Sequence, residues 1–343
     1  MDKYILGLER IFHDFVNSIS KEDQIGIVTH TDLDGIASAI FLQEILESKN
    51  LKIDFIEFLD YDSDTLENIL TKDFDVLFFT DWNVDAYLEY LSKLREKGKV
   101  FVIDHHPINP LLKDTSNFIK TESGYCSARC VFELGEFSGK WDWLVCSAII
   151  LDYTWDKLDN MNFIKIFYPN VTLENIWKFE PGRIGKLIAG ALIYYYPNYK
   201  KVYDLVIKKD LKNMEKARDV IEKEKIKWIQ KFKEEAEYFP EQKLHFYYAR
   251  SKYRIGSKVS SILSKNKFLG DTLVFVSDIP DKKGFVKLSA RNQKGKIDLN
   301  LVLKKCIKGF ENAVAGGHSK ASGGSFPKKY LNEFKRRLLE ELK

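Results

Sequence analysis

The 343-residue sequence predicts an α/β protein in which a doubly wound parallel sheet is joined by helices to a smaller α/β domain. Three observations lead to this prediction. In the first hundred residues, short apolar stretches alternate with helical patterns at a spacing of about 25 residues, which is typical of parallel strands with crossover helices. A stretch rich in lysine and glutamate follows later in the chain. Beyond it, a second set of strand-like segments begins near residue 241.

The first domain is expected to open with an amphipathic helix within residues 1–23, because charged residues interrupt the apolar positions there. The same interruptions are not those of a signal peptide. Short runs rich in β-branched and aromatic residues then predict four strands. The strands are expected at 25–30, 51–58, 75–82 and 100–106, with a helical pattern after each of the first three. Residues 120–153 are expected to be mostly helical.

The second half of the chain predicts a helical connection and a mixed domain. Between residues 160 and 198 glycines interrupt a helical pattern, and residues 199–240 carry apolar positions at helical spacing among many charges. After that, we expect three strands, an intervening helix, a glycine-rich turn at 313–326 and a C-terminal amphipathic helix. The predicted domains are therefore 1–198, a helical linker 199–240, and 241–343.

Composition sets limits on the environment of the protein. The formal net charge of +4 is small for this length, so it permits a local basic groove without demonstrating a nucleic-acid partner. No apolar run approaches the length of a membrane span, and we expect a cytoplasmic protein. The four cysteines show no paired CxxC spacing and are expected to be buried thiols.

Acidic and histidine residues follow three of the predicted strands. Each of these residues alone is usually structural, for instance as a helix N-cap. Three such strand ends in one sheet favour a site instead, because the carboxyl ends of parallel strands meet at one edge. The residues are His30, Asp32 and Asp34 at and just beyond the end of the first strand, Asp81 at the end of the third, and Asp104, His105 and His106 at the end of the fourth.

These imidazoles and carboxylates are too many for a single cation, and they suit two divalent ions that share a bridging carboxylate. Mixed nitrogen and oxygen ligands favour Mn²⁺ over Mg²⁺, with Mg²⁺ or Co²⁺ as substitutes. Such a pair can activate water near neutral pH and hold a phosphoryl oxygen. The sequence therefore predicts a two-metal hydrolase site.

The second domain offers candidate anion-binding groups. Paired glycines in AGGHSKASGG let backbone N–H groups approach an anion, with His318 and Lys320 beside them. Arg291, at the end of a strand in KLSARN, could make a bidentate phosphate contact. Tyrosines 247, 248 and 253 are candidates for stacking on bases. In isolation, a glycine-rich turn is as often structural, and the arginine and tyrosines more often are.

The ordered motifs THTDLDGIASA, FFTDWN, VIDHHP and AIILDYTW, followed by KLSARN and AGGHSKASGG, resemble those of the DHH–DHHA1 phosphoesterases. This superfamily includes RecJ exonucleases, nanoRNase/pAp phosphatases and cyclic-dinucleotide phosphodiesterases. The resemblance covers about residues 22–155 and 241–327. The first motif, H-x-D-x-D-G-I, resembles that of RecJ and its archaeal relatives, except that His30 replaces an acidic residue.

The resemblance implies a role for each matching residue. The ligands of a Mn²⁺ pair would be His30, Asp32, Asp34, Asp81, His105 and Asp152, with Asp81 as the bridging carboxylate. His106 would face the scissile phosphate, and Asp104 would orient the site. The substrate phosphate or terminal nucleotide would be held by Arg291, Gly316, Gly317 and His318. Asp152 is known only through the resemblance, because it lies on a helical pattern and not at a strand end.

The expected function is a Mn²⁺-dependent exonuclease that releases mononucleotides from single-stranded DNA or RNA, with a role in DNA repair. One alternative is an enzyme on short substrates, as in the nanoRNase/pAp phosphatases or the cyclic-dinucleotide phosphodiesterases. Another is a replication or repair scaffold, since some relatives assemble with helicases or GINS. The scaffold interpretation is disfavoured because scaffolds tend to lose metal ligands, and all six are present here. An active enzyme could still have such a protein partner.

Overall fold

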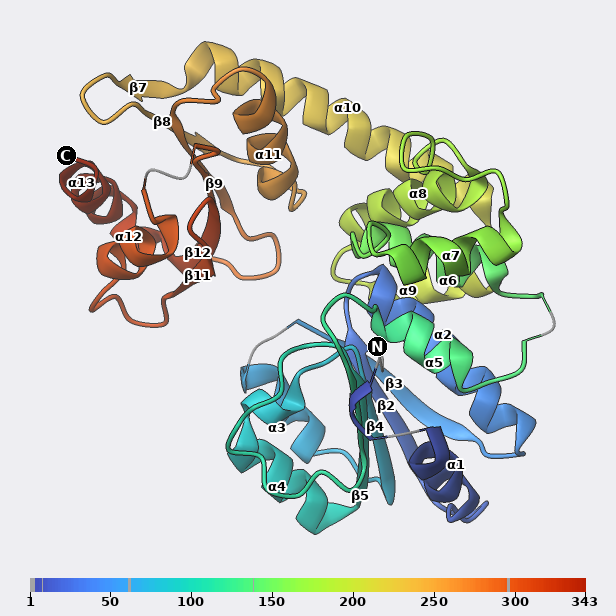
Figure 1. Ribbon diagram of the computed structural model, residues 1–343. Coiled ribbons are helices and arrows are strands. Elements are labelled where there is room, and N and C mark those ends of the chain that lie inside the picture. Colours follow the sequence, from blue (N-terminus) through green and yellow to red (C-terminus); the bar gives the residue numbers. More distant parts are fainter. Residues whose placement is uncertain (1–3, 8, 61–62, 138, 295–296) are drawn as a thin grey trace. The chain divides into compact units, whose positions relative to one another are not determined.

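The computed structural model in Figure 1 describes residues 4–7, 9–60, 63–137, 139–294 and 297–343. The chain divides into two compact units, Met1–Glu215 and Lys216–Lys343. The region predicted as a linker, 199–240, contains a short helix inside the first unit, a long helix that crosses the division, and a short strand in the second unit.

The first unit is built on a sheet that has six strands among the described residues, in the order β1-β6-β5-β4-β2-β3. All neighbouring pairs are parallel except β1 with β6. This confirms the predicted parallel sheet. The bounds are β1 Tyr4–Leu6, β2 Ile25–His30, β3 Ile53–Leu59, β4 Val76–Thr80, β5 Lys99–Asp104 and β6 Phe118–Thr121. The sequence did not predict the edge strand β1, and it assigned the lysine-containing β6 partly to a helix.

Helices cover both faces of this sheet, as the doubly wound prediction requires (Figure 1). On one face, α3 (Ser63–Leu70) and α4 (Leu88–Lys97) bury Leu66 and Leu94 against the strands. On the other, α1 (Glu9–Asn17) packs Phe12 edge-on against Phe101 of β5. The remaining helices of the unit are α2 Leu33–Ser48, the 3₁₀ turn η1 Val84–Ala86, α5 Ser127–Glu133, α6 Asp142–Leu151, α7 Leu158–Phe167, α8 Glu180–Tyr195 and α9 Tyr199–Ile207.

One of the glycines that interrupt the helical pattern between residues 160 and 198, Gly185, lies at a close contact between two helices. A Cβ on Gly185 of α8 would lie 2.1 Å from the Cδ2 atom of Leu151 at the end of α6. A side chain at this position would require the end of the Leu151 side chain to shift, so the glycine lets α8 pack closely on α6, which ends beside Asp152.

The second unit has a mixed sheet of six strands among its described residues, in the order β11-β12-β10-β9-β8-β7. Only β8 and β9 pair in parallel. The bounds are β7 Glu237–Phe239, β8 Leu244–Ala249, β9 Thr272–Asp278, β10 Phe285–Arg291, β11 Val314–His318 and β12 Ala321–Pro327. The predicted glycine-rich turn is wrong: the segment forms the β11–β12 hairpin, because pairing of β12 with β10 overrides the low strand propensity of glycine.

Helices cover both faces of the second sheet as well. The core on one face joins apolar strand residues to Leu303 of α12 and Phe334 of α13. On the other face, Phe232 of α10 stacks on Phe275 of β9. Tyr247 and Tyr253 are buried in this unit, so the prediction that they stack on bases is wrong. The helices are α10 Leu211–Glu235, α11 Gly256–Asn266, α12 Leu299–Cys306, the 3₁₀ turn η2 Lys328–Tyr330 and α13 Leu331–Glu341.

Two further expectations concern the whole chain. All four cysteines are buried thiols, as the sequence predicted. Within the residues that the structure describes, the helices are too short or too polar to traverse a bilayer.

Candidate metal centre

The first group of candidate ligands lies where β2 turns into α2. His30 is the last residue of β2, and Asp32 caps α2 by accepting a 3.1 Å hydrogen bond from the backbone N–H of Gly35. The turn is so tight that a Cβ on Gly35 would lie 2.3 Å from the carbonyl oxygen of His30. Glycine after the H-x-D-x-D pattern thus allows His30 and both aspartates to project from one short segment.

Asp34, in the first turn of α2, is held by a second helix. Its carboxylate accepts hydrogen bonds from the backbone N–H groups of Ser127, at 2.8 Å, and Ala128, at 2.6 Å. These two residues begin α5, and the N-terminus of a helix favours a negative charge. The α5 helix therefore fixes the orientation of a buried carboxylate that points toward the strand ends.

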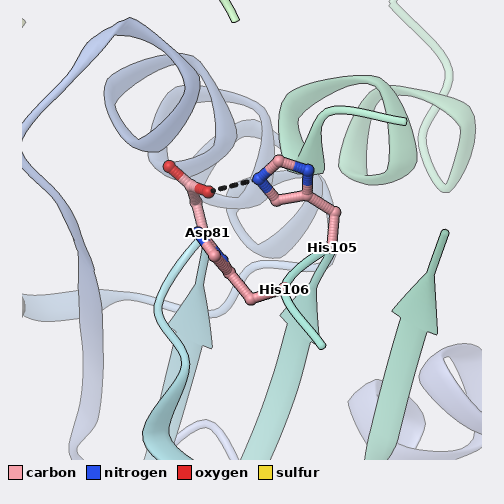
Figure 2. Close-up of side chains that lie close together, drawn as sticks. All are labelled: Asp81, His105 and His106. Atoms are coloured by element: carbon pink, nitrogen blue, oxygen red, sulfur yellow. Dashed lines mark ion pairs between the residues drawn. The ribbon is translucent and has the colours of Figure 1, made fainter. Parts of the chain in front are cut away.

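Asp81 follows β4, which lies between β2 and β5 in the sheet. Its backbone adopts a left-handed conformation with φ of 53°, which aspartate tolerates better than most residues. Oδ1 lies 3.4 Å from Nε2 of His105, and Oδ2 lies 3.6 Å from Nδ1 of His30 (Figure 2 shows the first contact). The two oxygens of one central carboxylate thus face histidines from the two neighbouring strands.

Asp104 is the last residue of β5, and the side chains of Asp104, His105 and His106 point in different directions. Asp104 accepts a 2.7 Å hydrogen bond from Nδ1 of His106. His105 instead turns toward the carboxylates: Nε2 lies 3.8 Å from Asp34, and Nδ1 lies 3.9 Å from Oδ2 of Asp152. Asp152 caps the C-terminus of α6, so a helix end supplies a group to an edge otherwise formed by strands.

The described part of the chain contains three groups of residues in each of which the potential ligand atoms lie within 4.8 Å of one another. They are Asp81, His105 and His106; His30, Asp32 and Asp81; and Asp34, His105 and Asp152. Asp81 belongs to two groups and His105 to two, so the groups form one continuous cluster. All six residues predicted as ligands are brought together. His106, predicted to face the substrate, also lies within ligand distance.

The donor atoms fit divalent cations. Nδ1 of His105 and Oδ2 of Asp152 are buried and form no hydrogen bond to any described residue, although they lie only 3.9 Å apart. Burial, together with the charge of Asp81, raises the pKa of Asp34 well above its usual value. Burial likewise raises the pKa of Asp152 to about 7. Closely spaced carboxylates in a buried site are costly unless cations neutralise them, and the mixed nitrogen and oxygen donors suit Mn²⁺.

Binding of Mn²⁺ is expected to release protons, because ligands must be deprotonated to coordinate. The pKa of His105 is raised to about 10, since contacts with Asp81 and Asp34 outweigh the opposing effect of burial. At pH 6.5 His105 and Asp152 are therefore both largely protonated in the metal-free protein, and both must lose a proton. More than one proton per protein should be released at that pH, and fewer at pH 8.5, where Asp152 is already ionised.

Titration calorimetry in buffers of different ionisation enthalpy measures this release directly. The apparent Mn²⁺ affinity should rise with pH over the same range. A heat signal that does not depend on the buffer at pH 6.5 would contradict the assignment of His105 and Asp152 as ligands.

Sequence reasoning missed one charged residue beside this centre. Lys120 of β6 is completely buried, and its ammonium group lies 2.7 Å from carboxylate oxygens of both Asp104 and Asp85. The available signal was a lysine directly after the apolar pair Phe118 and Ile119. The sequence pattern predicts a helix at residue 120, where a lysine is ordinarily solvated, and so does not predict its burial.

The predicted substrate residues lie in the second unit, around a pocket of about 370 Å³. Arg291, Gly316 and Gly317 line this pocket, whereas the exposed His318 is not among its lining residues. The guanidinium of Arg291 donates to the hydroxyls of Ser257 and Ser261 at 2.9 and 3.1 Å, and to the carbonyl of Ala290. Among the described residues no carboxylate forms an ion pair with it, so its positive charge can serve a bound anion.

The fold and this cluster together define a metal-dependent hydrolase of the α/β class. Residues 24–152 match the model of the DHH family, N-terminal domain, and residues 247–343 match that of the DHHA1 domain. The chain belongs to the DHH–DHHA1 phosphoesterase family. It is therefore a phosphoesterase, as predicted, and it has the divalent-metal chemistry of that family.

Solved structures share this fold at low sequence identity. The chain is similar to exonuclease RecJ bound to manganese, with a TM-score of 0.74, 15% identity, and coverage of 98% of this chain and 94% of that one. RecJ from Thermus thermophilus in complex with Mn²⁺ gives a TM-score of 0.70 at 16% identity, and the coverage is 97% of this chain and 54% of RecJ. CDC45 from Entamoeba histolytica gives 0.61 at 11% identity, covering 97% and 98%. No curated protein matches the chain.

Proposed function

We propose that this protein is a Mn²⁺-dependent exonuclease that removes mononucleotides from the end of single-stranded DNA or RNA. The observation that supports it most is the position of Asp81, whose two carboxylate oxygens face His105 and His30 at 3.4 and 3.6 Å. One carboxylate thereby joins two groups of ligands, which is the arrangement needed to hold two divalent ions on one phosphodiester.

In this proposal each ion has its own ligand group. His30, Asp32 and Asp81 would hold one ion and Asp34, His105 and Asp152 the other, and Asp81 would be the shared carboxylate. When bound, the ions supply Lewis acid chemistry: they polarise the phosphoryl oxygen and activate the attacking water. The contacts from α5 and α2 keep the carboxylates in place before substrate arrives.

His106 would contact the scissile phosphate. Its Nδ1 is hydrogen-bonded to the carboxylate of Asp104, which accepts and cannot donate when ionised. The hydrogen therefore resides on Nδ1, and Nε2 on the opposite side of the ring is the nitrogen directed to the substrate. When Nε2 also carries a hydrogen, the fixed imidazole can donate it to a phosphoryl oxygen or to the leaving group.

The second unit would hold the end of the nucleic-acid strand. The pocket around Arg291 offers a guanidinium without a carboxylate ion pair among the described residues, and guanidinium groups bind phosphate bidentately. A Cβ at Gly316 would meet nothing within 4 Å, so an anion can approach the backbone there. Gly317 and His318 follow Gly316 in β11 and would also contact the bound phosphate.

Several features favour a strand over a small molecule as the substrate. The spacing H-x-D-x-D-G resembles RecJ, and the KLSARN stretch is followed by IDLN as in RecJ-like sequences. Two of the similar structures are RecJ in complex with manganese. The retention of every expected ligand argues against a purely structural role in a replication or repair complex.

Digestion of end-labelled strands tests this function. With Mn²⁺, a single strand about 20 nucleotides long should yield mononucleotides stepwise from one end, faster than an equivalent duplex. Separate 5′ and 3′ labels on DNA and on RNA would give polarity and sugar preference in the same experiment. Cleavage of a dinucleotide, a cyclic dinucleotide or 3′-phosphoadenosine 5′-phosphate with no processing of the longer strand would instead establish the short-substrate alternative.

A further inference from the structure

Lys120 joins three segments of the first unit around one buried ammonium group. Its side chain is completely buried on β6, and Nζ lies 2.7 Å from Oδ2 of Asp104 and 2.7 Å from Oδ1 of Asp85. It also donates to Oδ1 of Asn83 at 2.9 Å and to the carbonyl oxygen of His106 at 3.3 Å. A buried ammonium persists only with such partners, and these come from the segments that follow β4 and β5.

Asp85 extends this network to Asn109, three residues beyond His106. Its second carboxylate oxygen accepts a 2.8 Å hydrogen bond from the backbone N–H of Asn109, and its carbonyl oxygen accepts another from the Asn109 side chain. The segment from Asp104 to Asn109 is therefore attached to the Lys120 network at both ends. His106 lies within that segment.

Asp104 connects the ammonium to the imidazole. One of its oxygens accepts from Lys120 and the other from Nδ1 of His106. With a donor 2.7 Å from each of its two oxygens, the carboxylate of Asp104 fixes the orientation of His106 and keeps a ring hydrogen on Nδ1.

We propose that Lys120 is a positioning residue for the phosphodiesterase site, which acts on the substrate only through Asp104 and His106. This rests on the proposed function, because it assigns a purpose to His106. The ammonium group fixes the positions of the carboxylates of Asp85 and Asp104. Through Asp104 it thereby fixes the position of His106 beside the metal cluster. Because the Lys120 side chain is completely buried, it would touch neither substrate nor ions.

A double-mutant cycle tests whether Lys120 acts on catalysis through His106. Lys120→Met should lower kcat for strand digestion by about 10–100-fold with a change in KM of less than about 3-fold. In a His106→Ala background, the same substitution should lower kcat by less than about 2-fold further, because the route through His106 is already lost. An equal loss in both backgrounds, or no loss in the first, would overturn the proposal.

Lys120→Met leaves the buried carboxylates of Asp85 and Asp104 without their cation, so it is expected to lower stability. A second variant that retains the Lys120 ammonium group is therefore needed. Asp104→Asn preserves shape and the contact between Lys120 and Asp85. It should reproduce the loss of kcat and the non-additivity with His106→Ala. Leu94 of α4 is buried against the same sheet and is not part of the Lys120 network. Leu94→Ala removes apolar volume there and should lower stability but not kcat. A loss of kcat in Leu94→Ala comparable to that in Lys120→Met would show a general structural effect.

A measurement without metal or substrate separates this inference from the function itself. In ¹H–¹⁵N spectra of the metal-free protein, the Nδ1–H correlation of His106 should be protected from exchange in the wild type. It should shift or disappear in Lys120→Met and Asp104→Asn. An unchanged imidazole signal would refute positioning even in an active enzyme. Conversely, the expected change in a protein that cleaves no nucleic acid would refute only the proposed function.

Discussion

Asp81→Asn is expected to reduce Mn²⁺-dependent phosphodiesterase activity by about 10³-fold or more. The substitution replaces one oxygen of the only carboxylate that faces both His30 and His105 among the described residues, so the two ion sites lose their shared ligand. The loss should appear in kcat, measured with saturating single-stranded substrate and excess Mn²⁺. Asparagine keeps the size of the side chain, so the effect reports the lost charge and ligand.

The fold should survive this change. The metal-free midpoint of thermal unfolding should stay within about 5 °C of the wild type, while the increase produced by Mn²⁺ should largely vanish, since that increase reflects binding to the folded state. Asp114→Asn makes the same charge change at an exposed position that pairs with Arg95, and should alter neither quantity. Activity of Asp81→Asn within tenfold of the wild type would invalidate the entire metal-site assignment.

The strand-end part of the site could be predicted because two local rules place it. Buried parallel strands are visible as apolar runs, and their carboxyl ends meet at one edge whatever the details of packing. His30, Asp81 and His105 each end or follow such a run, and they converge in the structure within ligand distance. Nothing beyond strand direction and adjacency was needed to bring them together.

The rest of the site depends on packing that the sequence does not encode locally. Asp152 reaches the cluster because α6 ends there, and the position of a helix end is set by contacts such as Gly185 against Leu151. Only the family resemblance identified it. Lys120 is buried because carboxylates from two other segments surround it, and a single lysine in a sequence carries no sign of such partners.

The glycine hairpin shows the same limit for secondary structure. Glycine has low intrinsic preference for strands, and a run containing four of them between residues 313 and 326 favoured a turn. The run became two strands because β12 pairs with β10 on one side and with β11 on the other. At Gly317, φ is 131° and a Cβ would lie 2.6 Å from the carbonyl oxygen of Ala321. Here the glycines permit tight pairing, and the anion-binding function proposed for them needs its own test.

Arg291→Ala is expected to raise KM for a phosphorylated single strand by about 10–100-fold, the scale of a lost charge-assisted phosphate contact. Arg291 lies in the second unit and its guanidinium is oriented by Ser257, Ser261 and Ala290, none of which belongs to the metal cluster. The loss should therefore fall mainly on substrate binding. Arg291→Lys keeps the charge but not the planar fork of donors, and should give an intermediate KM. Arg336→Ala removes an exposed arginine of the same unit and should leave KM unchanged.

Salt dependence adds a second, independent measurement to this prediction. If Arg291 neutralises one phosphate, the slope of log KM against log salt concentration should fall by about one in Arg291→Ala, whereas the slope of Arg336→Ala should match the wild type. Binding of a strand that lacks a terminal phosphate should be affected less than binding of the phosphorylated strand. A variant that loses kcat with KM and salt slope unchanged would place Arg291 outside the substrate contact and would remove the pocket from the proposed function.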